Sequence, residues 1–78
     1  MDIFSLGCTI TELFLDGTPL FTFPQLLAFR NGSFDPSSTI DRIEDASVRE
    51  MIFSMISLDP KNRLSAQQYL DRWFIALI

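Results

Sequence analysis

DIFSLGCTITELFLDG, residues 2–17, is the stretch of sequence that decides the fold. Asp2 is a typical N-cap residue, and Gly17 is typical of the position after a helix because glycine enters the left-handed region without steric cost. Between them, apolar side chains cover most of the helix circumference, which places such a helix inside a larger core or a membrane. The stretch is shorter than the roughly 20 apolar residues of a membrane span, and Thr9, Thr11 and Glu12 interrupt it. It therefore predicts a buried core helix.

The composition holds more apolar material than a lone small domain can easily cover. The chain has 78 residues, of which 47% are hydrophobic, 21% are charged and eight are Phe. A chain of this size hides only about 60% of the surface that its unfolded form exposes. We therefore expect either a piece of something larger or a domain that assembles with a partner.

Several classes of function are disfavoured by the charge and by the residue types. The net charge is −4 and the basic residues are scattered singly, so no stripe exists to neutralise the phosphates of a nucleic acid. Without His, and with Cys8 alone on the buried helix, neither a zinc pattern nor a nucleophile–base pair can be assembled. The three glycines are isolated and form no phosphate-binding loop. We therefore expect no catalytic, cofactor-binding or metal-binding residue in this chain.

Two shorter helical segments are predicted in the middle of the chain. Pro24 suits the first position of a helix, with Thr22 or Phe23 as the boundary residue, and Asn31-Gly32 is a typical helix end. Ile40 and Ile43 then indicate one helical turn.

The clearest local signal is a stripe of apolar residues at helical spacing. Its members are Val48, Met51, Ile52, Met55 and Ile56. They fall at i, i+3, i+4, i+7 and i+8, the pattern of one buried helical face. Ser47 with Glu50 has the spacing of a capping box, although Asp45 could cap the helix one turn sooner.

A last helix is predicted after Pro60, which ends the preceding one. Ser65 and Gln68 have the spacing of a capping box. We expect Tyr69, Leu70, Trp73 and Phe74 to point inward, and residues 73–78 are entirely apolar. No strand alternation appears, so the predicted class is all-α.

Two polar residues stand apart from this core pattern, and each has two interpretations. Asp2 can cap its own helix or reach across to another segment. Arg63 lies in a turn between two core helices, where its guanidinium is either solvated or paired with a carboxylate.

Essentially the whole chain resembles a portion of the large lobe of eukaryotic protein kinases. The residues that carry the resemblance to the kinase segment Asp-x-Trp-Ser-x-Gly…Glu-Leu…Gly-x-Pro-Phe are Asp2, Ser5, Gly7, Glu12, Leu13, Gly17, Pro19 and Phe21. Asp59-Pro60…Arg63 is similar to the Asp-Pro-x-x-Arg turn near the end of that lobe, while Phe4 departs from the usual Trp. The resemblance implies a partial kinase domain over residues 1–78, with a central buried helix and three or four shorter helices.

One kinase family is resembled more particularly by residues 19–21, 25–32, 43–45 and 48–50. It is the vacuolar-protein-sorting serine/threonine kinase, the kinase-like regulatory subunit of the class III phosphatidylinositol 3-kinase complex. The resemblance implies a fragment of a subunit that scaffolds this lipid kinase in endosomal sorting and autophagy. The implied partners are the rest of the kinase domain, the lipid kinase catalytic subunit and other complex subunits, with no nucleic acid and no transmembrane segment. The implied location is cytoplasmic, peripheral on endosomal or autophagic membranes.

The resemblance also implies a supporting role for the two polar residues. Asp2 would accept hydrogen bonds from the backbone of the catalytic loop, and Arg63 would pair with the Glu of the Ala-Pro-Glu motif that closes the activation segment. The glycine-rich loop, the ATP-pairing Lys, the His-Arg-Asp loop and the Asp-Phe-Gly metal site are absent from these 78 residues. ATP and Mg²⁺ would thus bind to the parent domain and not to this chain.

Two alternatives stay open at this point. The chain could be a stand-alone helical module for protein interaction, or a large-lobe piece of another, active serine/threonine kinase. Motifs encoded upstream would separate the last alternative from the first interpretation.

The missing motifs lead to a first prediction. We expect the 78-residue chain to show no saturable binding of ATP·Mg²⁺ in isothermal titration calorimetry, because every group that holds phosphate or Mg²⁺ in kinases is absent. Micromolar affinity in this measurement would contradict the assignment of the nucleotide site to the parent domain.

Overall fold

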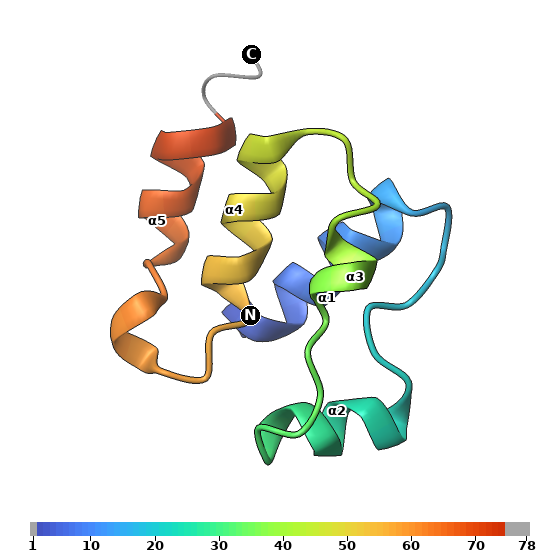
Figure 1. Cartoon of the computed structure of the whole chain (residues 1–78). Coiled ribbons are helices and arrows are strands. Elements are labelled where there is room, and N and C mark those ends of the chain that lie inside the picture. Colours follow the sequence, from blue (N-terminus) through green and yellow to red (C-terminus); the bar gives the residue numbers. More distant parts are fainter. Residues whose placement is uncertain (1, 75–78) are drawn as a thin grey trace.

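The computed structural model describes residues 2–74, which are helical and contain no strand (Figure 1). The elements are α1 (Ile3–Phe14), α2 (Phe23–Arg30), α3 (Ser37–Ile40), α4 (Ala46–Met55), the 3-10 turn η1 (Pro60–Asn62), α5 (Ala66–Tyr69) and the π-helical turn η2 (Leu70–Phe74). The all-α prediction is confirmed, and four shorter helices accompany the long first one.

Helix α1 packs against α4, and this contact is very close at Gly7. A Cβ atom added to Gly7 would lie 2.9 Å from Met55 Cβ and 3.2 Å from Ile56 Cγ2. One turn along α1, the fully buried Thr11 donates its hydroxyl to the Gly7 carbonyl at 2.9 Å. Gly7 therefore permits the close approach of the two helices, and the polar atom of Thr11 is satisfied inside its own helix.

The core lies around α4, which Figure 1 shows between α5 and the pair α1 and α3. All five residues of the predicted stripe are buried there. They pack with Ile10 and Leu15 from the first helix, with Leu20, with Ile40 and Ile43 around the short α3, and with Tyr69 and Trp73 from the last helical segment. The helical spacing thus identified the face of α4 correctly.

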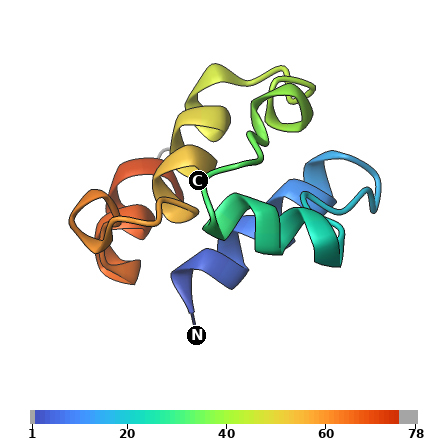
Figure 2. The same ribbon diagram turned by 60° about the horizontal axis from the view of Figure 1, so that its bottom comes forward.

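Helix α1 is covered on only part of its circumference by the described residues. Gly7, Ile10 and Thr11 are its buried residues, whereas Leu13 is 75% exposed and Phe14 is 51% exposed. Helix α2 lies along another side of α1, away from α5 (Figure 2). Residues 2–73 therefore do not cover all the apolar faces of α1, in line with the apolar composition.

The helix starts follow the predicted caps with one exception. Thr22 with Gln25 and Ser65 with Gln68 form reciprocal capping boxes. At α4 the Ser47–Glu50 box is wrong and the alternative cap, Asp45, is confirmed: its carboxylate accepts hydrogen bonds from the backbone N–H groups of residues 47 and 48.

In the last helical segment, Tyr69 and Trp73 face the core as predicted. The Trp73 indole N–H donates to the Ser47 carbonyl at 2.9 Å, which ties this segment to the start of α4. The prediction for Leu70 is wrong: it is 47% exposed, because positions 69 and 73 form the inward face and the next residue points about 100° away. The side chain of Phe74 and residues 75–78 lie outside the described part of the chain.

The close contact at Gly7 leads to a second prediction. We expect Gly7→Ala to lower the free energy of unfolding by about 1–2 kcal/mol, because overpacking costs ~1–3 kcal/mol and removing a mid-helix Gly returns only ~0.5–1 kcal/mol. Chemical denaturation followed by far-ultraviolet circular dichroism measures this change. Leu13→Ala on the exposed side of α1 is the control, with an expected change of no more than ~0.5 kcal/mol. A stabilised Gly7→Ala variant would show that α1 and α4 are not in contact here.

Candidate functional site

Asp2 caps its own helix α1, which is the first of the two interpretations that the sequence allowed. Its Oδ1 accepts from the Phe4 N–H at 3.1 Å, and its Oδ2 accepts from the Ser5 hydroxyl at 3.4 Å. The residue is exposed. Both carboxylate oxygens therefore keep lone pairs that face solvent, because an ionised carboxylate can accept about four hydrogen bonds.

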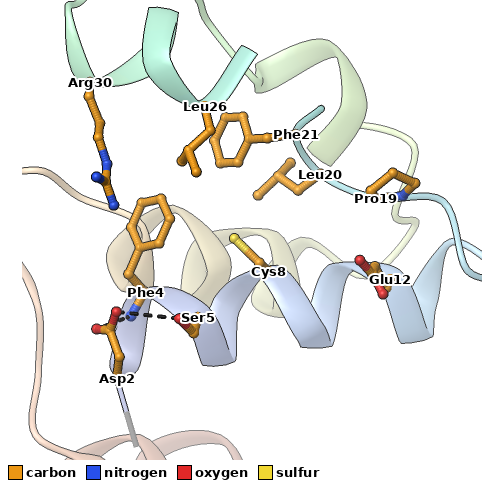
Figure 3. Close-up of a pocket in the computed structure, with 10 residues that line it drawn as sticks. All are labelled: Asp2, Phe4, Ser5, Cys8, Glu12, Pro19, Leu20, Phe21, Leu26 and Arg30. Atoms are coloured by element: carbon orange, nitrogen blue, oxygen red, sulfur yellow. Dashed lines mark hydrogen bonds between the residues drawn. The ribbon is translucent and has the colours of Figure 1, made fainter. Parts of the chain in front are cut away.

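A groove of about 250 Å³ runs along α1 beneath α2 (Figure 3). We call it the α1–α2 groove; its lining is Asp2, Phe4, Ser5, Cys8, Glu12, Pro19, Leu20, Phe21, Leu26 and Arg30. Asp2, Ser5, Cys8 and Glu12 share one face of α1, since they recur at intervals of three or four residues. The opposite wall in Figure 3 is apolar and is formed by Phe21 and Leu26.

Aromatic side chains hold α2 on α1. The Phe4 and Phe21 rings stack with centroids 6.1 Å apart, and Phe29 lies 5.0 Å from Phe21 and 6.2 Å from Phe4. The Arg30 guanidinium lies 5.9 Å from the centroid of the Phe4 ring, at cation–π distance. Phe4, which stands where the kinase motif has Trp, therefore fills an aromatic position between two helices.

Arg63 lies half-buried in a second hollow, which it shares with Asp2. We call it the Asp2–Arg63 hollow; its volume is about 440 Å³ and its lining is Asp2, Ile3, Pro60, Arg63, Leu64 and Ser65. Within residues 2–74 no carboxylate lies at ion-pair distance from the Arg63 guanidinium. The structure thus brings together the two polar residues that the sequence indicated separately, without pairing them.

The surroundings of Cys8 favour the protonated form of its thiol. Burial raises the pKa of the Cys8 thiol above its usual range, and the nearby carboxylates of Glu12 and Asp2 raise it further. No cluster of three metal-binding side chains occurs in the described residues, and none of their helices is long and apolar enough to span a membrane. The groove and the hollow thus offer carboxylate hydrogen-bond acceptors beside the guanidinium groups of Arg30 and Arg63, an arrangement that suits binding.

Two residues of the site were not predicted from the sequence. Ser5 was recognised as part of the kinase motif, but its bond to the Asp2 carboxylate was not. Arg30 was recognised only as part of the segment 25–32 that carries the family resemblance, although it overhangs the α1–α2 groove. The spacing of Asp2 and Ser5, one helical turn apart, was a usable signal. The sequence held no signal for the approach of Arg30 to Phe4, because this contact depends on how α2 packs against α1.

The sequence of the chain is similar to segments of known protein kinases. No family model matches the chain. It is 53% identical over 73 residues to "Serine/threonine-protein kinase VPS15" of Arabidopsis thaliana, and 50% identical over 74 residues to "Serine/threonine-protein kinase vps15" of Schizosaccharomyces pombe. Each alignment covers 94% of the chain. The chain is homologous to a segment of the VPS15 serine/threonine kinases.

The VPS15 relatives are much longer than this chain. The aligned segment spans only 5% of the Arabidopsis VPS15 protein and 4% of the Schizosaccharomyces pombe protein. A more distant similarity, 34% identity over 76 residues, joins the chain to "Mitogen-activated protein kinase kinase kinase 15" of Mus musculus. The VPS15 resemblance inferred from the sequence is therefore confirmed at the level of a homologous segment.

The environment of Cys8 leads to a third prediction. Because the fold favours the neutral thiol, its contribution to stability is complete below the pKa of the unfolded thiol and is lost as the pH rises through the higher folded pKa. We expect iodoacetamide to alkylate Cys8 of the folded chain slowly at neutral pH. The midpoint of the pH profile, the pH at which the alkylation rate is half-maximal, should be higher for the folded chain than for the chain unfolded in urea. Glu12→Gln should lower the midpoint, whereas the remote Glu44→Gln should leave it unchanged. A folded midpoint at or below the unfolded one would contradict this assignment.

Proposed function

We propose that residues 1–78 form a partial kinase domain, the C-terminal portion of its large lobe, in a VPS15-type protein. In this proposal the chain supports a kinase site and carries none of the groups that perform the chemistry. The observation that carries it is the meeting of Asp2 and Arg63 in one hollow of a chain homologous to a VPS15 segment.

Asp2 is suited to hold a catalytic loop in place. Its carboxylate is fixed at the first turn of α1 by Phe4 and Ser5, yet it stays exposed beside both hollows. The free lone pairs can accept backbone N–H groups of a segment that lies over the end of α1. A charge-assisted hydrogen bond of this kind is stronger than a neutral one. This geometry supports the role that the kinase resemblance implies for Asp2.

Arg63 is suited to bind a carboxylate that approaches from outside residues 2–74. Its guanidinium is half-buried and presents a planar fork of N–H donors that matches a carboxylate. In the proposed domain its partner is the Glu of the Ala-Pro-Glu motif. Two segments next to each other, the catalytic loop and the end of the activation segment, would then rest on the same hollow.

The rest of the kinase domain would also cover the apolar surface that this chain leaves open. Leu13 and Phe14 at the end of α1 are exposed, and the α1–α2 groove has an apolar wall. Large exposed apolar patches on soluble proteins usually mark interaction sites. This exposure supports a fragment that packs within a larger domain.

Through the parent protein, we propose a role in scaffolding class III phosphatidylinositol 3-kinase for endosomal sorting and autophagy. The partners are the lipid kinase catalytic subunit and other complex subunits, and the location is cytoplasmic and peripheral on endosomal or autophagic membranes. ATP and Mg²⁺ would bind to other parts of the parent domain. The similarity to the mouse kinase favours a second candidate, a large-lobe piece of another active serine/threonine kinase, but at 34% identity against 53% it is the weaker one.

The proposed pairing of Arg63 leads to a fourth prediction. In the full-length VPS15-type protein, Arg63→Ala should lower the melting temperature and speed proteolysis of the activation segment, because it leaves the partner carboxylate unpaired. Breaking a pair of this kind costs roughly 3–5 kcal/mol when its burial is complete. In the 78-residue chain the same change should stay within ~0.5 kcal/mol.

Two further variants sharpen this test. Arg63→Lys should restore only part of the loss, since an ammonium cannot form the planar two-pronged contact. The control is Arg42→Ala, which removes an exposed guanidinium between α3 and α4 that does not line the Asp2–Arg63 hollow. Equal losses for Arg63→Ala in the full-length protein and in the chain would mean that its partner lies inside this chain, and the proposed role would be wrong.

A further inference from the structure

We infer that Ser54 and Tyr69 are positioning residues, whose hydroxyl groups fix the backbone on both sides of Arg63 and so aim its guanidinium into the Asp2–Arg63 hollow. This inference rests on the role proposed above for Arg63. It assigns a task to two hydroxyl groups that come from different helices and meet beside the turn that carries Arg63.

Four groups form one continuous chain of hydrogen bonds. The Leu64 N–H donates to the Tyr69 hydroxyl at 3.1 Å, the Tyr69 and Ser54 hydroxyls lie 2.7 Å apart, and the Ser54 hydroxyl donates to the Asn62 carbonyl at 2.9 Å. The chain thus begins at the residue after Arg63 and ends at the residue before it. We call it the hydroxyl relay.

The direction of each hydrogen bond in the relay follows from counting protons. A hydroxyl group has one proton to donate. The Ser54 proton goes to the Asn62 carbonyl, so the Tyr69 hydroxyl must donate to Ser54 and accept from the Leu64 N–H. Every donor in the relay is used once. Hydrogen bonds aligned in one direction strengthen one another, and removing one member leaves its neighbours unsatisfied.

The two hydroxyl groups are themselves held firmly. Tyr69 is 1% exposed, and its ring packs against Trp73 with centroids 5.6 Å apart. Ser54 belongs to α4, around which the core lies. A Ser inside a helix often bonds to the carbonyl four residues earlier, but this one reaches across to the turn. The relay therefore connects the turn to the rigid part of the fold.

The relay matters because the turn around Arg63 has little other support from regular structure. The Arg63 backbone is extended, with φ −97° and ψ 134°, and its N–H donates to the Pro60 carbonyl at 3.2 Å. Together with the relay, this bond fixes three consecutive residues. A guanidinium at the end of a long, flexible side chain loses less entropy on binding when its backbone is already in place.

The first test measures the relay itself in the full-length VPS15-type protein. Tyr69→Phe keeps the ring and removes the hydroxyl, so hydrogen exchange at the Leu64 amide should become at least about 10-fold faster. Ser54→Ala should act in the same direction. Ser47→Ala, in the first turn of the same helix, is the matched control and should leave this exchange unchanged. Unchanged exchange at Leu64 in Tyr69→Phe would overturn the relay.

The second test asks whether the relay acts through Arg63. Tyr69→Phe should speed proteolysis of the activation segment several-fold, and should have no further effect when Arg63→Ala is already present. Additive effects of the two changes would overturn the positioning role, because a residue that only stabilises the fold acts regardless of Arg63. If Arg63→Ala alone left proteolysis unchanged, the proposed role of Arg63 would fail, whereas the exchange at Leu64 would still report on the relay by itself.

Discussion

The arrangement of this chain depends on the close approach of α1 and α4 at Gly7. With a hydrogen atom in place of a side chain, the α1 backbone comes within van der Waals distance of Met55 and Ile56. The Thr11 hydroxyl, fully buried at the same interface, bonds within α1 and leaves no polar atom to satisfy from α4. Helix α2 then packs on α1 through the rings of Phe4 and Phe29, and Trp73 ties the last helical segment to the start of α4.

The two packed helices bring distant parts of the chain to one place. Asp2 lies at the start of α1, and Arg63 follows α4 in the turn before α5. Both line the same hollow, because α4 ends beside the beginning of α1. The aromatic contacts of Phe4 place α2 on another side of α1, so Asp2 also borders the α1–α2 groove. A single helix start therefore faces two surfaces that can receive other segments.

Several features of the site were readable in the sequence because they are local. A cap involves residues two or three positions apart, which is why the Asp2 cap, Thr22 as a boundary residue and the Ser65–Gln68 box were predicted correctly. The apolar stripe of α4 follows from the helical repeat alone. The motif residues indicated a kinase, and the VPS15 homology confirmed the family that they resemble.

What only the tertiary structure decided are the contacts between segments far apart in sequence. The wrong prediction for Leu70 shows the limit: its hydrophobicity matches that of a buried residue, but Tyr69 and Trp73 form the inward face of this segment and Leu70 is exposed beside them. The sequence alone determined that the chain is all-helical, with a central helix whose apolar faces exceed what the chain can cover. That Asp2 and Arg63 line one hollow was visible only in the packed structure. Asp2 precedes α1 and Arg63 precedes α5, and no short-range sequence pattern encodes the distance between two positions so far apart in the chain.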